Sequence, residues 1–254
     1  SYCIIPYVRG SVRSKNFETV IKEAKLLTQK GHKEIVLTGI HTGHYMDNDY
    51  DLTDLINELS KIEDLLRIRI SSIELNDKFL NMLSTNKKVC DHLHIPLQAG
   101  SDEILKKMNR KYDLKYYEEK IKKIRMIRPD ISITTDIIVG FPYETDKLFN
   151  ETLEFSRKMN FSKIHVFPYS IRIGTSAANM PNQVDESIKK ERVKKLMDLS
   201  ETMEKEYYNK FVGKELDILV EECDNNVSIG HSSNYLMIRL NEKLEVGQIY
   251  KRII

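Results

Sequence analysis

Three cysteines carry the most distinctive chemistry in this sequence. Cys3, Cys90 and Cys223 lie far apart in 254 residues, and their odd number does not fit a disulfide framework. Free thiols are typical of a reducing cytoplasm. A thiolate is also a soft ligand for iron. We interpret Cys90 and Cys223 as inert buried residues, whereas Cys3 lies in the motif-like stretch 1–10 (SYCIIPYVRG).

The elements that must position such residues follow from the hydrophobic pattern. Helical spacing is present at 17–30, where Gly31 ends it, and at 52–62, where Asp51 is an N-cap. Further helices are expected at 75–83, 102–108, 114–127 and 145–159. Short apolar runs predict strands at 34–38, 67–72, 91–95, 132–139 and 163–167. This alternation indicates a parallel sheet of βα units, either a barrel or a doubly wound sheet.

Polar and glycine-containing stretches follow these strands. In a parallel α/β sheet the active site lies beyond the carboxyl ends of the strands. We therefore expect the site among TGIHTG (38–43), SSIE (71–74), PLQAGS (96–101), GFPYE (140–144) and PYS (168–170). The helix at 17–30 has no predicted strand ahead of it. A complete βα barrel needs that strand, so the chain is expected to start one element late.

The composition changes after about residue 185. A long charged helical pattern covers 185–208, and short strands are predicted at 215–221, 226–230, 236–240 and 248–254. Strands this short and closely spaced fit a small antiparallel barrel. We place the boundary near Val212, which gives domains at 1–211 and 212–254.

Six ordered motifs resemble those of the radical-SAM methylthiotransferase family. They are CIIPYVRG, EIVLTGIHTGHY, RISSIE, HIPLQAGSDEILKKMNRKY, TTDIIVGFPYET and KIHVFPYS. The stretch 37–43 (LTGIHTG) is most similar to the branch that acts on threonylcarbamoyladenosine in tRNA. The region 212–254 resembles a TRAM domain, an RNA-binding module. The resemblance implies an α/β fold: a partial (βα) TIM-like barrel without its first strand, then a small antiparallel β-barrel.

The resemblance implies a [4Fe–4S] cluster and S-adenosylmethionine (SAM) as cofactors. In the family, three cysteines of a C-x3-C-x2-C loop bind three irons of the cluster, and Cys3 matches the third of these cysteines. The reduced cluster cleaves SAM, and the resulting radical abstracts hydrogen from the substrate. A second cluster in an N-terminal domain supplies the sulfur, and a second SAM supplies the methyl group. We therefore expect an N-terminally truncated chain that is inactive alone, and we assign no catalytic residue.

SAM contacts are implied at three strand ends. Gly140, Phe141 and Pro142 match the stretch that packs on the adenine, with Tyr143 where a glycine is common in the family. For Gly140 the alternative is a turn that closes the strand.

The other implied SAM contacts are polar. They are Ser71, Ser72, Glu74, Gln98 and Ser101. The alternative for the first group is a helix N-cap at Ser72 or Asn76, and for the second a cap before the helix at 102–108. The histidine pairs His41/His44 and His92/His94 are interpreted as loop and structural residues rather than metal ligands.

The strongest basic run lies at 104–128. It is either a solvated helix face or a surface that binds RNA phosphates. With a tRNA substrate, the expected contacts are Lys106, Lys107, Arg110, Lys111, Arg9 and Arg13. Tyrosines within the run could stack on bases, although packing is the default.

The sequence thus predicts a tRNA methylthiotransferase that converts N6-threonylcarbamoyladenosine beside the anticodon to its 2-methylthio form. The alternatives are a methylthiotransferase for isopentenyladenosine in tRNA or for a ribosomal protein, and a noncatalytic RNA-binding fragment. The expected partners are the tRNA anticodon stem-loop and an electron donor such as flavodoxin or ferredoxin. We expect a cytoplasmic monomer without a membrane span, because no run of about 18 apolar residues is present.

Overall fold

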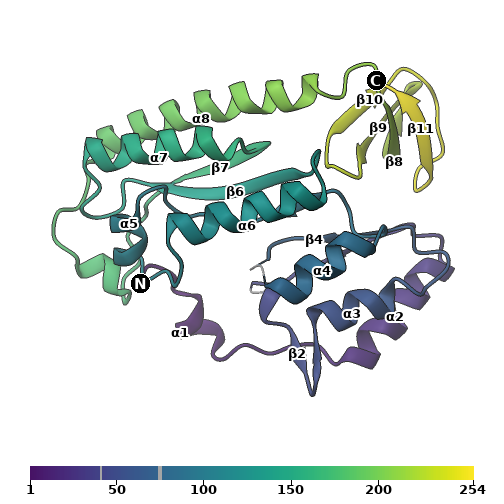
Figure 1. The fold of residues 1–254 in the computed structure, drawn as a ribbon, viewed down its shortest axis with the longest axis horizontal. Coiled ribbons are helices and arrows are strands. Elements are labelled where there is room, and N and C mark those ends of the chain that lie inside the picture. Colours follow the sequence, from purple (N-terminus) through teal and green to yellow (C-terminus); the bar gives the residue numbers. More distant parts are fainter. Residues whose placement is uncertain (41, 74–75) are drawn as a thin grey trace. The chain divides into compact units, whose positions relative to one another are not determined.

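The computed structural model describes residues 1–40, 42–73 and 76–254 (Figure 1). The chain divides into two compact units. Unit 1 comprises residues 1–11, 95–123 and 133–207, and unit 2 comprises residues 12–94, 124–132 and 208–254. None of the described helices is both long and apolar enough to cross a membrane.

Unit 1 is built around a parallel strand pair. Its elements are α1 (Ile5–Arg9), α5 (Asp102–Lys107), most of α6 (Leu114–Ile127), β6 (Ser132–Val139), α7 (Asp146–Met159), β7 (Lys163–Pro168), the 3-10 helix η2 (Ser176–Asn179) and α8 (Glu186–Asn209). Strands β6 and β7 run parallel, with Thr134 opposite Lys163 and Val139 opposite Pro168. Most of β6 is buried, as expected for a strand covered on both faces.

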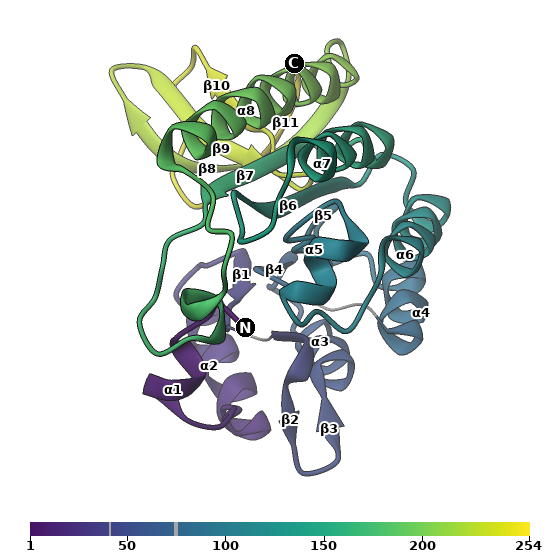
Figure 2. The same ribbon diagram turned by 90° about the vertical axis from the view of Figure 1, so that its left-hand side faces the viewer.

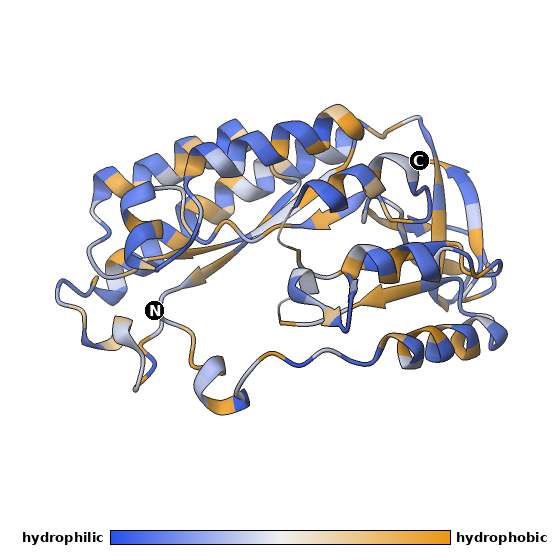
Figure 3. Ribbon diagram, turned by 60° about the horizontal axis from the view of Figure 1, so that its bottom comes forward, coloured by the Kyte–Doolittle hydropathy of each residue, from blue (hydrophilic) through white to orange (hydrophobic). Residues whose placement is uncertain are grey.

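Local signals set the ends of the unit 1 helices. The Thr145 side chain accepts a hydrogen bond from Leu148 N and caps α7, and Asn160 ends this helix in the left-handed conformation. The helices change between hydrophilic and hydrophobic along their length, as amphipathic helices do (Figure 3). Apolar residues of these helices, such as Ile104 and Leu148, form a core cluster with Phe141 and Tyr169 from the loops after β6 and β7.

Unit 2 contains a second parallel pair and an antiparallel sheet. Its elements are α2 (Phe17–Gln29), β1 (Glu34–Leu37), η1 (Thr42–His44), the hairpin β2 (Met46–Asp47) and β3 (Tyr50–Asp51), α3 (Leu52–Leu59), β4 (Arg67–Ile70), α4 (Asp77–Thr85), β5 (His92–His94), β8 (Glu215–Asp224), β9 (Val227–Ser232), β10 (Met237–Leu240) and β11 (Ile249–Ile253). Strand β1 pairs with β4 in parallel. The C-terminal strands form an antiparallel sheet in the order β10-β9-β8-β11.

Two buried arginines of β4 connect the β1–β4 pair to the C-terminal antiparallel sheet. Arg69 Nε donates to Glu34 Oε1 at 2.7 Å, and Arg67 Nη1 lies 3.5 Å from Glu34 Oε2. Arg67 also donates to the main-chain carbonyls of Asp217 and His231, the latter at 3.1 Å. The C-terminal sheet is thereby docked on β4 through its own backbone carbonyls.

The predicted elements are largely confirmed. The helix at 114–127 and the strand at 132–139 have the predicted bounds, and the two strand pairs are parallel as expected. Residues 1–16 contain α1 and no strand. The α/β fold is therefore confirmed in its parallel βα units.

A closed C-terminal barrel is not confirmed. The edge strands β10 and β11 each pair with one neighbour, and among the described residues they do not pair with each other, so the sheet is open. Strand β10 has only four residues, which limits the ladder that it can extend. The domain boundary near Val212 remains a prediction.

Candidate functional site

Cys3 is exposed, although its neighbours are fastened to unit 1. The Ser1 carbonyl accepts a hydrogen bond from Ala177 N at 2.9 Å, and Ser1 Oγ donates to the Lys107 carbonyl at 3.0 Å. The segment that carries Cys3 is therefore held at the end of α5 and at η2. This arrangement fixes the backbone and presents the thiol.

Tyr2 connects Cys3 to several residues predicted from the sequence. Its hydroxyl donates to Gln98 Oε1 at 2.6 Å and accepts a hydrogen bond from Arg110. Its ring meets Phe141 edge to face, with 6.0 Å between centroids. Gln98, Arg110 and Phe141 thus gather around one tyrosine, which the sequence analysis did not single out.

Gln98 is fixed by β6 as well as by Tyr2. Its N donates to the Asp136 carbonyl at 2.8 Å, and its carbonyl accepts from Ile138 N at 2.9 Å. Its φ is 72°, an uncommon value for a residue with a side chain. Backbone held in such a conformation occurs frequently at ligand sites, which is consistent with the predicted role of Gln98.

A buried ion pair stabilises the turn after β6. Gly140 N donates to Glu144 Oε1 at 2.7 Å, and this carboxylate pairs with Arg192 of α8 at 2.9 Å. Burial raises the pKa of Glu144, and the Gly140 N–H and Arg192 oppose this shift. Gly140 has a φ of 71°, and a Cβ there would lie 2.3 Å from Lys189 Cγ. The fold alone thus requires this glycine, and its contact with SAM remains a prediction.

The next residues of the turn form its buried side. Phe141 is fully buried in the core cluster, and Pro142 is buried as well. Tyr143 has a φ of 72°, so it adopts the conformation that favours glycine at a cost of about 1 kcal/mol. Lys107 Nζ lies 3.9 Å from the Tyr143 ring centroid. The turn therefore keeps a glycine-like backbone with tyrosine in place.

Two of the predicted serines have hydroxyls available to a ligand. Ser101 Oγ and Ser71 Oγ are buried, and neither has a hydrogen-bond partner among the described residues. Ser101 lies at the N-cap position of α5 without making a side-chain capping bond. A buried hydroxyl without a partner costs free energy, which a polar ligand atom would recover. Each serine, within its own unit, fits a contact to a polar group such as those of SAM.

Of the two capping alternatives, Asn76 is confirmed and Ser72 is wrong. The Asn76 side chain accepts from Phe79 N at 2.7 Å at the start of α4. The Ser72 carbonyl instead accepts a hydrogen bond from Thr42 Oγ1. Glu74 lies outside the described residues, as does His41.

The described residues supply only part of an iron–sulfur site. Among residues 1–40, 42–73 and 76–254, no group of three or more His, Cys, Asp and Glu side chains could hold a metal ion. Cys90 is buried as predicted, and burial raises its pKa to about 12, whereas Cys223 is half-buried, which differs from the prediction. His92 stacks on Tyr235, with 4.7 Å between ring centroids, as expected of a structural histidine. Cys3 fits one cluster ligand, and the described residues do not fit a complete three-thiolate set.

The predicted RNA-binding residues have different surroundings. Arg9 and Arg13 are exposed, as are Lys106 and Lys111. Arg110 is engaged internally with Tyr2. Lys107 is likewise engaged, with Tyr143. The exposed cations are thus the better test of phosphate binding, and Arg110 also supports the Cys3 segment.

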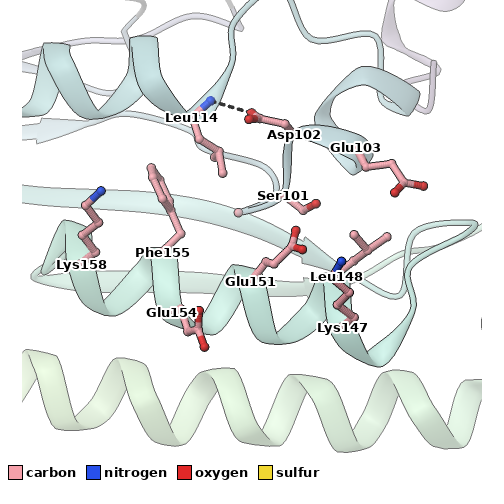
Figure 4. A pocket seen from close by; sticks show the side chains of 11 residues that line it. Ser101, Asp102, Glu103, Leu114, Lys147, Leu148, Glu151, Glu154, Phe155 and Lys158 are labelled. Atoms are coloured by element: carbon pink, nitrogen blue, oxygen red, sulfur yellow. Dashed lines mark hydrogen bonds between the residues drawn. The ribbon is translucent and has the colours of Figure 1, made fainter.

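An open pocket of about 450 Å³ lies among α5, α6 and α7 (Figure 4). Leu114, Leu148 and Phe155 give it apolar walls, and Glu151 and Lys158 stand among its charged side chains. Charges of both signs line it, and this balance favours no particular ligand class.

The family profile described as the radical SAM superfamily matches residues 1–156. The chain belongs to the radical SAM superfamily. Its matched region includes Cys3, Gln98, Ser101 and the turn that follows Gly140, so the residues gathered around Tyr2 lie within the radical SAM region. The predicted resemblance to radical-SAM proteins is thereby confirmed.

Curated relatives of this radical SAM chain are named tRNA-modifying enzymes. The threonylcarbamoyladenosine tRNA methylthiotransferase of Bacillus subtilis is 44% identical over 94% of this chain and 55% of its own length. That of Aquifex aeolicus is 42% identical over 100% of this chain and 62% of its own length. The tRNA-2-methylthio-N(6)-dimethylallyladenosine synthase of a Thermoanaerobacter species is 44% identical over 87% of this chain and 48% of its own length. The chain therefore spans about half to three-fifths of these relatives.

Solved structures support the radical SAM fold. The radical SAM enzyme coproporphyrinogen III oxidase of Escherichia coli aligns with a TM-score of 0.57 at 17% identity, over 74% of this chain and 45% of that chain. The radical S-adenosylmethionine methyltransferase TsrM of Kitasatospora setae aligns with a TM-score of 0.50 at 14% identity, over 61% of this chain and 31% of that chain. At such identities the likeness establishes the fold alone.

Sequence reasoning missed the burial of two charged side chains of unit 1. Lys189 and Arg192 are buried although they lie on a highly charged helix, and Tyr169 is buried beside Phe141 with 5.2 Å between ring centroids. Tyr169 Oη has no hydrogen-bond partner among the described residues. Tyr169 belongs to the stretch PYS (168–170) directly after β7, where the site was expected from the sequence.

Proposed function

We propose that the protein to which this chain belongs is a tRNA methylthiotransferase that converts N6-threonylcarbamoyladenosine beside the anticodon to its 2-methylthio form. The observation that carries this proposal is the 44% identity, over 94% of the chain, to the Bacillus subtilis relative of that name. The stretch 37–43 (LTGIHTG), which resembles the same branch, supports it.

Within unit 2, this stretch is connected to a candidate SAM contact. Thr42 is buried, and its hydroxyl donates to the Ser72 carbonyl. A change in the stretch would therefore alter the position of the strand end that carries Ser71 and Ser72. Thr42 is a positioning residue in this proposal.

The proposed cofactors are SAM and [4Fe–4S] clusters, two in the full-length enzyme. SAM supplies the methyl group, and its one-electron cleavage supplies the means to activate a C–H bond. Of this chain's residues, Cys3 would ligate one iron. In unit 1, Gln98, Ser101 and the backbone at Gly140 would orient SAM.

The proposed partners follow from the same chemistry. In the cytoplasm, a flavodoxin or ferredoxin would donate the electron. The enzyme would act as a monomer. It would bind the anticodon stem-loop through Arg9, Arg13, Lys106 and Lys111. Residues 212–254 would add an RNA-binding surface. Charge reversal at Lys106 and Lys111 should flatten the salt dependence of tRNA binding.

The substrate assignment is tested by deleting the full-length gene and analysing tRNA nucleosides by mass spectrometry. We expect 2-methylthio-N6-threonylcarbamoyladenosine to disappear. If it persists while the 2-methylthio form of isopentenyladenosine disappears, the second candidate is correct. That candidate is favoured by the equal 44% identity to the Thermoanaerobacter relative.

We also propose that the 254-residue chain alone is inactive, because its described residues offer only one motif thiolate. After reconstitution of the chain with iron and sulfide, we expect neither a stoichiometric, EPR-active [4Fe–4S] cluster nor SAM cleavage. Observation of both would contradict this statement.

A further inference from the structure

The loop after β7 exposes apolar side chains at its tip, which comprises residues 171–174. Ile173 is 92% exposed and Ile171 is 51% exposed, and Arg172 between them is exposed as well. An isoleucine side chain that stays this exposed contributes almost no hydrophobic free energy to folding. Exposed apolar groups that cluster with cations are typical of a surface that binds a partner.

The tip is held in one conformation by its own hydrogen bonds. Thr175 is 1% exposed, and it donates to the Arg172 carbonyl from both its N, at 3.1 Å, and its Oγ1, at 2.7 Å. Gly174 has a φ of 90°, which completes the tight turn. The tip therefore loses its conformational entropy during folding, and a partner that binds it does not have to order it.

The tip lies beside the segment that carries Cys3, all within unit 1. Ile4 Cδ1 lies 3.8 Å from the position of a Cβ on Gly174, and Ala177 N binds the Ser1 carbonyl. Figure 2 shows α1 and the loop between β7 and α8 side by side near the N-terminus. Helix α1 adds Tyr7, which is 69% exposed.

Three segments without acidic residues meet at Ser1. Residues 1–17, 104–112 and 155–184 contain no Asp or Glu, although the whole chain has 38 of them among 254 residues. Ser1 is hydrogen-bonded to Lys107 of the second segment and to Ala177 of the third. Among the ion pairs of the described residues, none involves Arg9 or Arg172.

We propose that Tyr7, Arg9, Arg172 and Ile173 form a face that binds unpaired nucleotides of the RNA substrate. Ile173 and the Tyr7 ring would contact base faces, which present a π surface whatever the base. Arg9 and Arg172 would bind the adjacent phosphates. The proposal rests on the proposed function, because it concerns the substrate of the same enzyme. The absence of acids from the three segments favours RNA over a protein partner.

The test uses the full-length protein with two probes of equal length: an anticodon stem-loop RNA and a fully paired RNA duplex. Ile173→Ser should weaken stem-loop binding about tenfold and leave duplex binding unchanged, because only the loop offers unpaired bases. Arg172→Gln should weaken stem-loop binding and reduce the slope of log K against log salt by about 0.7. Met197→Ser and Arg157→Gln, exposed on α8 and α7 of the same unit, are the matched controls and should change neither value.

The outcomes separate this proposal from the proposed function. If the wild-type protein modifies tRNA but Ile173→Ser binds the stem-loop like wild type, the face proposal is wrong and the function stands. If the wild-type protein neither binds nor modifies tRNA, the proposed function fails. If Ile173→Ser leaves RNA binding intact and instead exposes a new protease-sensitive site elsewhere in the full-length chain, a protein segment covers the face and the RNA proposal is overturned.

Discussion

Cys3 and Cys90 have opposite surroundings, although each is held by a polar network. Cys90 is 1% exposed, and its thiol lies 3.9 Å from Glu34 Oε2, beside the arginines of β4. Cys3 is exposed, and the hydrogen bonds near it are made by Ser1 and Tyr2. In unit 2 the network encloses the thiol and builds the fold. In unit 1 the network fixes the neighbours and presents the thiol.

The largest expected difference between the two cysteines is in reactivity. Burial raises the pKa of Cys90 to about 12, so Cys90 should be alkylated by iodoacetamide at pH 8 roughly a thousand times more slowly than an ordinary exposed thiol, and far more slowly than Cys3. Peptide mapping by mass spectrometry after timed alkylation of the apo protein measures both rates. Comparable rates would mean that the unit 2 network does not enclose its thiol.

The buried network of unit 2 should carry a large part of its stability. Glu34→Gln leaves the guanidinium groups of Arg67 and Arg69 buried without a counter-charge, so we expect a loss of about 3–5 kcal/mol in the free energy of unfolding by urea. The matched control is Glu215→Gln, whose partner Lys251 is exposed at 3.8 Å. This control should unfold like wild type. An equally stable Glu34→Gln protein would show that the arginines are satisfied by backbone carbonyls alone.

The turn after β6 offers a smaller effect with an internal control. Gly140→Ala should cost about 2–3 kcal/mol, because a positive φ and a clash with Lys189 add together. Gly213→Ala has a similar φ of 80° and open space around it, so it should cost about 1 kcal/mol. Urea unfolding of both variants separates the two contributions. Equal losses would mean that Lys189 moves aside without cost.

Tyr2 should contribute the smallest of these effects. Tyr2→Phe keeps the ring contact with Phe141 but removes the hydrogen bonds of the hydroxyl with Gln98 and Arg110, so we expect a loss of about 1–2 kcal/mol in unfolding free energy. Tyr7→Phe alters a 69% exposed tyrosine and should leave stability unchanged. Equal stability of both variants would indicate that the Tyr2 hydroxyl does not anchor the segment.

Much of this fold follows from the sequence, because its elements depend on local patterns. The β-branched run at 132–139 and the helical spacing at 114–127 each gave the observed bounds. Helix α1 and the hairpin of β2 and β3 were missed, since both are too short for a periodic signal.

Burial of charge could not be predicted in the same way. The alternation at 67–72 indicated a strand, and β4 covers its first four residues. Arg67 and Arg69 are buried because carbonyls of β8 and the β9 region, about 150 residues further along the chain, accept their hydrogen bonds. Arg192 of the charged helix α8 is buried for the same reason, because it forms an ion pair with Glu144, which lies in a turn distant in sequence. The local periodicity of a sequence does not reveal such distant partners, so the burial of these charges could not be predicted from it.

In the candidate site, too, some features could be predicted from the sequence and others could not. The strand-end rule assigned Gln98 and Phe141 to one site, and Tyr2 contacts both of them. The assignment of Cys3 as a cluster ligand rests on the family and on the exposure of its thiol.

The most direct test compares Cys3→Ser with Cys90→Ser in the full-length protein after reconstitution with iron and sulfide. If Cys3 is a cluster ligand, Cys3→Ser loses the EPR signal of the SAM-binding [4Fe–4S] cluster and the cleavage of SAM, while Cys90→Ser retains both. A Cys3→Ser protein that keeps the cluster and cleaves SAM at the wild-type rate would show that Cys3 is not a ligand.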